Sequence, residues 1–255
     1  MRFFVVSDIH SFYKPLIKAL DEAGFDSKNS EHWLIVCGDC FDRGPDSELV
    51  LHFLMSLERK ILIKGNHDTL LDDCCIREFP YNYDVSNGTV KTINDIGGAE
   101  EGYNFDICCQ RTWNKLAAYR NVLINYFETE NYIFVHSFIA HRCKDDLPVH
   151  YIRNRQYEFD PNWRNASKND WEHAMWVNPF ELAEQGINQT GKIIVFGHWH
   201  CSAGWSKDEN ISEFGEDAKW DIYHNTEQNV IAIDCCTAYT GKVNVLVIDD
   251  NFLTE

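Results

Sequence analysis

Residues 3–10, with the sequence Phe-Phe-Val-Val-Ser-Asp-Ile-His, decide the fold because an apolar run ends directly in polar groups. The unbroken apolar run over residues 3–6 predicts a buried strand. Asp8 and His10 follow it, and residues two apart in an extended chain point to the same side. We therefore expect both side chains to be able to hold one metal ion at the end of that strand.

Four more polar segments end hydrophobic runs further along the chain. They are residues 38–44 (Gly-Asp-Cys-Phe-Asp-Arg-Gly), 65–68 (Gly-Asn-His-Asp), 135–137 (Val-His-Ser) and 197–200 (Gly-His-Trp-His). Ligands of open α/β sheets bind outside the carboxyl ends of the strands. The five segments are therefore expected to converge on one rim, although they lie far apart in the sequence.

The first 63 residues alternate short apolar strands with amphipathic helices. Strands are expected at 3–6, 33–36 and 61–63, and helices at 15–23 and 45–57. Proline near the start of each helix and Gly24 after the first one support these bounds. The β-α-β-α-β pattern predicts an α/β fold with parallel pairing and right-handed crossovers.

Residues 70–120 are polar and aromatic, and they predict a cap-like insertion over one edge of the sheet. A helix is expected within it at about 107–119. Residues 138–190 are expected to be irregular and helical, and 202–228 to form a polar loop. Because the chain shows no repeat, low-complexity tract or linker, residues 1–255 are interpreted as a single domain.

Strands are expected to resume after the insertion at residues 122–127, 132–135, 192–196, 230–233 and 243–248. The first two are interpreted as a hairpin, and the last two as closing strands on either side of a turn at Gly241.

The composition indicates a globular protein with an acidic surface. Hydrophobic residues make up 44% of the 255 residues and charged residues 25%, a balance that supports a packed core. The net charge of -17 repels nucleic-acid phosphates, so no nucleic-acid groove is expected. A small phosphorylated substrate requires metal ions and an arginine to reverse that potential locally.

The cysteines point to a reducing compartment. Of the 10 cysteines, six form three adjacent pairs and none forms a Cys-x-x-Cys motif, so they are interpreted as buried thiols. We expect no signal peptide, because an apolar strand begins near residue 2 without a charged segment before it, and no apolar stretch approaches membrane-spanning length. We expect a cytoplasmic protein with no membrane partner.

The polar segments supply a complete set of ligands for two metal ions. The candidates are Asp8, His10, Asp39, Asn66, His136, His198 and His200. A single histidine after a strand is more often a packed residue, but the combined pattern is typical of a two-metal centre. Carboxylate and imidazole ligands suit Mn, Fe, Zn or Ni, and Asp39 is the natural bridging carboxylate.

Three further side chains suit catalysis on a phosphoester. Two ions lower the pKa of a shared water, and the resulting hydroxide is expected to attack phosphorus. Arg43 is expected to clamp phosphate oxygens, although it could instead pair with Asp42 or Asp46 at a helix entry. His67 is expected to protonate the leaving group with Asp42 as its orienting partner, and Asp68 to be a hydrogen-bond acceptor or helix cap.

The order of these motifs, from about residue 8 to residue 200, resembles the calcineurin-like metallophosphoesterases. The closing segment over 233–247 is also similar to the hairpin that ends that family. The Asp-Arg-Gly and Gly-Asn-His segments particularly resemble its phosphoprotein phosphatase branch, which includes bacterial and phage serine/threonine phosphatases and diadenosine tetraphosphate hydrolases. The resemblance implies a four-layer α/β/β/α sandwich with helical insertions and a dinuclear centre.

Ligand sets follow from the same resemblance. It implies one metal on Asp8, His10, Asp39 and His200, and a second on Asp39, Asn66, His136 and His198. Its branch usually has glycine where Ser11 stands and glutamate where Asp68 stands, and residues 137–138 also depart from it. The branch uses a second substrate arginine, for which Arg142, Arg153 and Arg155 are candidates.

The first functional hypothesis is a metal-dependent phosphatase acting on phosphomonoesters, either a phosphoprotein or a small phosphorylated metabolite. We expect two divalent ions, manganese first, with iron, zinc and nickel as alternatives. The second hypothesis is a dinucleoside polyphosphate hydrolase or phosphodiesterase on the same fold. A metal-binding scaffold without activity is the third, and the presence of every catalytic element disfavours it.

Overall fold

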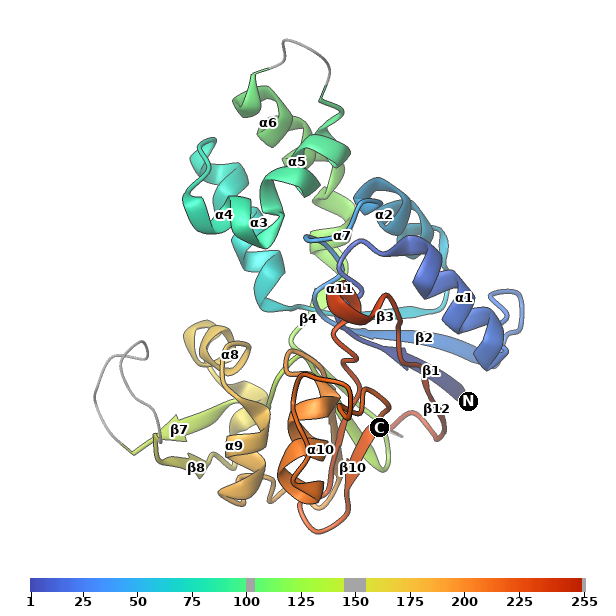
Figure 1. The fold of residues 1–255 in the computed structure, drawn as a ribbon, viewed down its shortest axis with the longest axis vertical. Helices are drawn as coiled ribbons and strands as arrows, with labels where there is room; N and C mark the ends of the chain where they lie inside the picture. The colour runs from blue at the N-terminus through green and yellow to red at the C-terminus, as the bar shows by residue number, and fades with distance from the viewer. Residues whose placement is uncertain (100–103, 145–154, 254–255) are drawn as a thin grey trace.

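The computed structural model describes residues 1–99, 104–144 and 155–253. It contains two five-stranded sheets with helices on their outer sides (Figure 1). None of the helices in these ranges combines the length and apolarity that a bilayer crossing requires.

The first sheet has the strand order β12-β1-β2-β3-β4. Its strands are β1 (Arg2–Val6), β2 (His32–Cys37), β3 (Lys60–Ile63), β4 (Leu123–Ile124) and β12 (Leu246–Asp249). The pairs β1–β2, β2–β3 and β3–β4 are parallel, and β12 runs antiparallel to β1. The predicted β-α-β-α-β start of the chain is thus present, with crossover helices α1 (Tyr13–Ala23) and α2 (Ser47–Ser56).

The end of α1 shows how local sequence sets these bounds. Gly24 adopts a left-handed conformation with φ of 82°, and its N–H donates to the carbonyls of Leu20 and Asp21. Glycine adopts this conformation without the steric cost that a Cβ brings, so the helix stops there. Leu16 and Leu20 on the buried face then pack with Phe4 of β1.

The second sheet has the strand order β10-β11-β9-β6-β5. Its strands are β5 (Tyr126–Glu128), β6 (Tyr132–Val135), β9 (Ile193–Phe196), β10 (Tyr223–Asn225) and β11 (Val230–Ala232). The helices α8 (Lys168–Ala174), α9 (Pro179–Glu184) and α10 (Cys201–Glu209) share an apolar cluster with this sheet.

Alternation along the strands explains the layering. In β1, Phe4 belongs to the cluster shared with the helices of the first sheet, whereas Phe3 belongs to a different cluster. That second cluster joins Phe3 to Phe134 of β6 and Val195 of β9, so the two sheets pack face to face. The predicted four-layer α/β/β/α sandwich is confirmed.

The described residues between β3 and β4 form five helices. They are α3 (Asn66–Arg77), α4 (Asn82–Asn87), α5 (Thr89–Gly97), α6 (Phe105–Lys115) and α7 (Ala117–Val122). Figure 1 shows α4, α5 and α6 at the opposite end of the molecule from α8, α9 and α10. The segment predicted as an insertion at about 70–120 is therefore helical over nearly its whole described length, and its behaviour as a cap stays a prediction.

The strand expected over residues 122–127 is wrong in one respect, because the chain changes sheets within it. β4 pairs in parallel with β3, whereas β5 pairs antiparallel with β6 in the other sheet. The hairpin expected with 132–135 is present, but only β5 belongs to it. Pairing partners that lie far apart in sequence decide where the strand divides.

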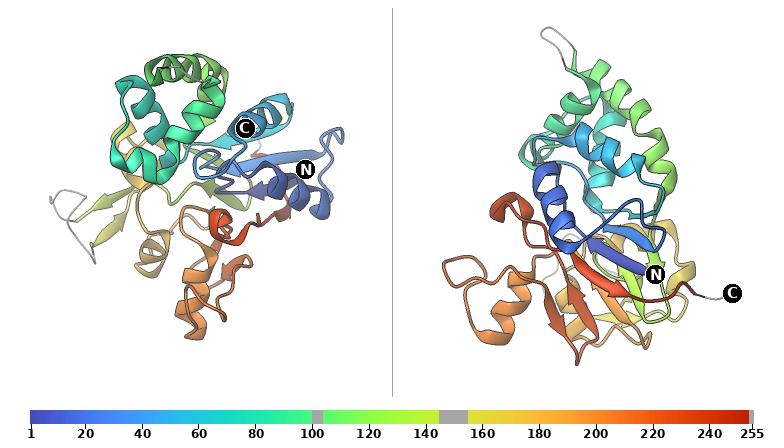
Figure 2. Two further views of the ribbon diagram at one scale, coloured as in Figure 1. Left: turned by 45° about the horizontal axis from the view of Figure 1, so that its top comes forward. Right: turned by 90° about the vertical axis from the view of Figure 1, so that its right-hand side faces the viewer.

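The prediction that the last two strands form a closing hairpin is also wrong. β11 belongs to the second sheet and β12 to the first, with helix α11 (Thr237–Thr240) between them. Figure 2 shows the C-terminal strand against the N-terminal one, in agreement with the β1–β12 pairing. Gly241 has a φ of 67° and ends α11 rather than forming a hairpin turn.

Two other stretches contain more structure than expected. The segment predicted as a loop at 202–228 contains most of α10 and all of β10. The sequence did not predict α10, because small residues, including Ala203 and Gly204, form its buried face and give no apolar periodicity. Within 138–190 the described chain also forms a two-stranded ribbon of β7 (His141–Cys143) and β8 (Tyr157–Phe159), beside the expected helical segments.

Candidate metal centre

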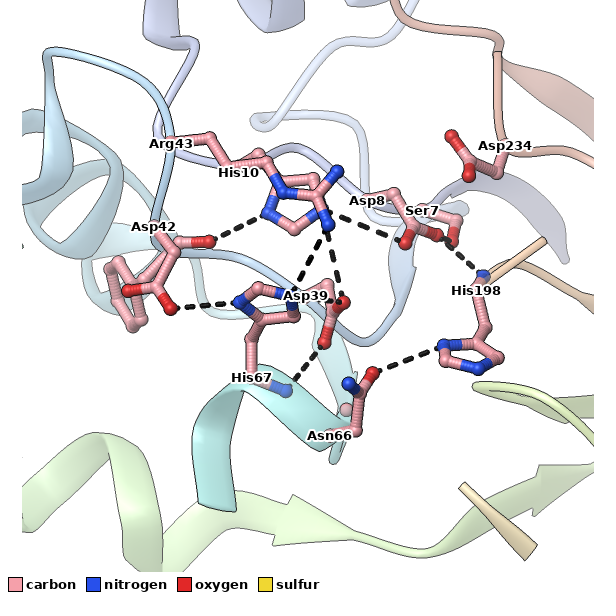
Figure 3. A network of polar contacts seen from close by, with 12 residues as sticks. Ser7, Asp8, His10, Asp39, Asp42, Arg43, Asn66, His67, His198 and Asp234 are labelled. Carbon is pink, nitrogen blue, oxygen red and sulfur yellow. Dashed lines mark hydrogen bonds and ion pairs between the residues drawn. The ribbon is translucent and has the colours of Figure 1, made fainter. Parts of the chain in front are cut away.

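Both sheets direct polar groups to one pocket at the carboxyl ends of their strands. The predicted ligands that converge there are Asp8 and His10 after β1, Asp39 after β2, Asn66 at the start of α3, His136 after β6 and His198 after β9. Most of them surround one centre in Figure 3. The pocket encloses about 290 Å³.

His10 presents one ring nitrogen to two carboxylates. Its Nδ1 donates to the carbonyl oxygen of Phe41 at 2.8 Å, which leaves Nε2 with a lone pair. That Nε2 lies 3.8 Å from Oδ2 of Asp39 and 3.9 Å from Oδ1 of Asp8. The tautomer and the direction of the ring therefore suit metal ligation.

His136 is held in the same manner on the other side of the pocket. Its Nδ1 donates to the carbonyl oxygen of Cys37 at 2.9 Å, and its Nε2 lies 2.8 Å from Oδ1 of Asn66. In a neutral ring that Nε2 and the amide oxygen are both acceptors, so neither satisfies the other. Two lone pairs directed at one another are the arrangement that a bound cation satisfies, so the residues fit a metal site.

The described part of the structure contains two groups of candidate ligand atoms, and the atoms within each group lie within 4.8 Å of one another. Asp39 belongs to both groups. One group is His10, Asp39 and His67, and the other is Asp39, His136 and His198. The sharing matches the bridging position predicted for Asp39. Burial opposes ionisation of this carboxyl, but the imidazoles of His136, His67 and His10 together hold its pKa below the usual range.

Asp8 is oriented by two donors. The Ser7 hydroxyl and the backbone N–H of His198 both donate to its Oδ2, the latter at 2.9 Å. Burial raises the pKa of Asp8 to about 6. A nearby cation would favour the ionised carboxylate, which is the form that ligates metals.

The two residues predicted to form an acid pair are hydrogen-bonded to each other. His67 Nδ1 donates to Oδ2 of Asp42 at 2.8 Å, and Nη2 of Arg43 lies 3.4 Å from Nε2 of His67 (Figure 3). Burial lowers the pKa of His67, but the carboxylates of Asp39 and Asp42 outweigh it and raise that pKa above its usual value.

His200 is the predicted ligand that the structure places differently. It lines the pocket, but its Nε2 lies 2.8 Å from Oε1 of Glu213. Its ring also packs on Phe214 and Trp220, at 4.8 and 5.7 Å between ring centroids. These contacts hold the ring beside the pocket, and its ligand role stays a prediction.

The backbone of the site is strained. Non-glycine residues in the left-handed region include Asp8, His10, Asp39, Asp42, Arg43 and His198. The conformation costs about 1–2 kcal/mol for an L-residue, and such strain concentrates at functional sites. Packing is equally tight, because a Cβ on Gly65 would collide with the Asp39 carboxylate and one on Gly197 with Asp8.

Asp68 has the supporting role that the sequence predicts. Its Oδ2 accepts from the N–H of Gly65 at 2.8 Å and caps α3, and its Oδ1 accepts from the hydroxyl of Tyr119 at 2.9 Å. The first turn of α3 is thereby fixed. The N–H of His67 in that turn donates to Oδ1 of Asp39 at 3.0 Å.

Sequence reasoning missed Thr89, a residue of the helical insertion. Its hydroxyl donates to Oδ2 of Asp42 at 2.7 Å, and the hydroxyl of Thr92 accepts from the N–H of Asp42 at 3.0 Å. The carbonyl of Asn87 accepts from the N–H of Arg43 at 3.2 Å. No sequence pattern links these positions, because the contacts bridge more than 40 residues.

Asp234 was also missed, although a signal existed. It lines the pocket just beyond the end of β11, so the strand-end argument applied to it. Its Oδ1 accepts from the N–H of Cys236 at 2.7 Å. Burial, reinforced by the nearby Asp8, raises the pKa of Asp234 well above its usual range.

The candidates for a second substrate arginine lie elsewhere. Arg142 and Arg155 line a separate cavity of about 540 Å³, which shares no lining residue with the metal pocket in the described ranges. Arg142 pairs there with Asp160 at 3.0 Å. Arg153 lies outside the described residues.

Comparison with known proteins shows that the chain matches a known family over most of its length. The family described as Calcineurin-like phosphoesterase matches residues 1–202. A curated relative, "Bis(5'-nucleosyl)-tetraphosphatase, symmetrical" of Buchnera aphidicola subsp. Schizaphis graminum (strain Sg), is 41% identical over 69 residues, 27% of this chain and 24% of the relative. The chain thus spans about a quarter of the length of the curated relatives that it matches.

Solved structures share the fold. A protein serine/threonine phosphatase from Saccharomyces cerevisiae aligns with a TM-score of 0.53 and 12% identity over 100% of this chain and 81% of that chain. The cold-active protein-tyrosine phosphatase of a psychrophilic Shewanella species aligns with a TM-score of 0.52 and 14% identity over 98% of this chain and 76% of that chain.

Proposed function

We propose that this chain, which belongs to the calcineurin-like phosphoesterase family, hydrolyses phosphoesters with a pair of divalent metal ions. The observation that carries the proposal is the position of Asp39. It is shared by two groups of ligand atoms, and it lies beside the pair formed by His67 and Asp42. Ligands for two ions, a proton donor and a cationic side chain thus surround one pocket.

The metal ligands of the proposal are the residues already described. Asp8, His10 and Asp39 would hold one ion, and Asp39, Asn66, His136 and His198 the other. When bound, two such ions supply positive charge to the phosphate oxygens and activate the attacking water. Because the donors are imidazole nitrogens and carboxylate or amide oxygens, manganese is the first ion to test, followed by iron, zinc and nickel.

Arg43 would bind the phosphate. It lines the pocket with Asp8 and Asp39, and its guanidinium lies beside the ring of His67. A planar guanidinium binds two phosphate oxygens at once, which fixes the orientation of the phosphorus. In a chain with a net charge of -17, this local positive charge also draws an anionic substrate into the pocket.

His67 would protonate the leaving oxygen. Its Nδ1 is occupied by Asp42, so Nε2 is the atom able to deliver the proton. The raised pKa keeps the ring protonated to a higher pH than a free histidine, as an acid catalyst requires. The carboxylate of Asp42 stabilises that protonated form.

The substrate of the first proposal is a phosphomonoester, either a phosphoprotein or a small phosphorylated metabolite. A dinucleoside polyphosphate hydrolase or phosphodiesterase is the second candidate, and the name of the relatives supports it. For either substrate we propose the cytosol, since all ten cysteines are free thiols.

Hydrolysis by purified, manganese-loaded protein tests both candidates. We expect p-nitrophenyl phosphate to be cleaved, and His67→Asn to retain the metal while turnover falls about 10²- to 10⁴-fold. A clear preference for diadenosine tetraphosphate or bis-p-nitrophenyl phosphate over monoesters would assign the second candidate. His52→Asn, which changes an exposed histidine on α2, is the matched control and should behave as the parent protein.

One combination of results would overturn the proposal. The phosphoesterase assignment is excluded if no phosphoester is cleaved with any of the four metals and His67→Asn changes nothing. Metal analysis of the same samples shows whether the protein was loaded.

A further inference from the structure

Four aromatic side chains lie in the metal pocket or beside it, two of them in its lining and two in contact with one of those. They are Trp199, Phe214, Trp220 and Tyr239, and we refer to them as the aromatic rim. Phe214 lies 5.6 Å from Trp220 and 5.8 Å from Tyr239, and Trp220 lies 5.3 Å from Tyr239, all between ring centroids. The rings come from the turn before α10, the chain between α10 and β10, and α11.

The aromatic rim is continuous with the proposed catalytic pocket. Trp199 and Phe214 line the same cavity as Arg43 and Asp39. Phe214 is 52% exposed and Tyr239 is 63% exposed, which is unusual for large apolar rings that contact one another. A cluster of exposed rings at the edge of a polar pocket is typical of a binding surface.

The segment that carries Phe214 is anchored at several points. Glu213 pairs with His200 at 2.8 Å. Further along, the carbonyl of Trp220 accepts from the side-chain amide of Asn244 at 2.8 Å, and that of Asp221 accepts from the indole of Trp205 at 3.0 Å. The rings are thus held in place before any ligand arrives, which reduces the entropy lost on binding.

We propose that the aromatic rim binds the planar ring of a nucleoside phosphate while the metal pocket holds its phosphate group. This inference rests on the proposed phosphoesterase function and specifies its substrate class. Each of the nucleic-acid bases can stack on an aromatic side chain, because every base has a π-face. A nucleotide supplies such a ring together with the scissile phosphate, whereas phosphoserine and phosphothreonine supply no ring.

Charge argues against an anionic membrane as the occupant. Glu213, Glu216 and Asp217 lie on the same segment as Phe214, and the last two are exposed. These carboxylates repel anionic lipid headgroups. A neutral base stacks without that penalty, and its phosphate is drawn to Arg43 within the same cavity.

Paired substrates test the proposal. We compare diadenosine tetraphosphate and adenosine monophosphate, which carry the base, with O-phosphoserine, which does not. Phe214→Ala should raise KM for the nucleotides about tenfold or more and leave O-phosphoserine unchanged, because one stacking partner is lost. Phe214→Trp should restore nucleotide affinity, and Tyr239→Ala should act in the same direction as Phe214→Ala.

Phe79→Ala is the matched control. It removes a ring that is 63% exposed, as Tyr239 is, but that lies on the helical insertion and does not line the pocket. It should leave every kinetic constant unchanged. Equal losses on nucleotides and O-phosphoserine in Phe214→Ala, or no change on either, would overturn the nucleoside subsite.

Equilibrium binding separates this inference from the phosphoesterase proposal. Adenosine monophosphate should quench the fluorescence of Trp199 and Trp220 in the parent protein and bind at least tenfold more weakly to Phe214→Ala. If no phosphoester were cleaved, the proposed phosphoesterase function would be wrong. This measurement would still test whether the aromatic rim binds a nucleoside. Equal affinity of the parent protein and Phe214→Ala would refute it, as would binding to neutral phosphatidylcholine vesicles in place of the nucleotide.

Discussion

The two sheets contribute to the pocket in different ways. In the first sheet, three consecutive parallel strands each end in predicted ligands, and Asp39 at the end of the middle one belongs to both ligand groups. In the second sheet, β6 and β9 pair in parallel but are separated by more than 50 residues, and each contributes one imidazole to the ligand group of Asp39, His136 and His198. The first sheet therefore supplies the shared carboxylate, and the second supplies groups that serve one ion.

The largest expected effect comes from the centre of the first sheet. Asp39→Asn removes the charge shared by both ligand groups, so we expect both ions to be lost and activity to fall more than about 10³-fold. Metal analysis of the purified variant checks this. Two ions retained at full occupancy would contradict the bridging role of Asp39.

His198→Asn is the corresponding change in the second sheet. Because His198 belongs to one ligand group, this variant should keep about one ion and lose about 10²-fold in activity, less than Asp39→Asn. Metal content measured side by side in the two variants sharpens the comparison. Identical losses would show that the sheets contribute equally.

Asp42→Asn should change the pH dependence without removing metal. Asp42 raises the pKa of His67, so the neutral amide lets that pKa fall and the protonated acid is lost at a lower pH. The alkaline limb of kcat should move to lower pH, and turnover on poor leaving groups should fall about ten- to a hundredfold. An unmoved alkaline limb would argue against His67 as the acid.

The smallest expected effect comes from the helical insertion. Thr89→Val keeps the shape of the side chain but removes the hydrogen bond to Asp42, so we expect turnover to fall roughly three- to tenfold with KM unchanged. Thr69→Val, which changes a hydroxyl without a hydrogen bond in the described part of the chain, is the matched control. If Thr89→Val equalled the parent protein, the insertion would have no part in orienting the acid pair.

The elements that the sequence predicted well are those with local signals. The bounds of β1, β2, β3 and α1 follow from short apolar runs and from the glycine at position 24. The division between β4 and β5 and the placement of β12 depended on which distant strand each segment pairs with. Periodicity reports burial, and it carries no information about the pairing partner.

The same distinction applies to the pocket. Asp8, Asp39 and Asn66 were recognisable because each follows an apolar strand in a motif whose residue types suit metals. Strand ends meet on one rim of a parallel sheet, so their convergence was implied by the order of the chain. The packing of two sheets was needed to bring His136 within hydrogen-bond distance of Asn66.

Residue types and the order of the predicted elements were thus enough to predict the α/β class and the candidate metal ligands, because hydrophobic runs and ligand chemistry are local properties of the chain, whereas the four layers were predicted from the family resemblance. Tertiary packing alone placed Thr89 on Asp42, Asp234 in the pocket and His200 against Glu213. It also gathered the aromatic rim from three separate segments. Such contacts depend on the relative positions of elements distant in sequence, and no local pattern encodes those positions.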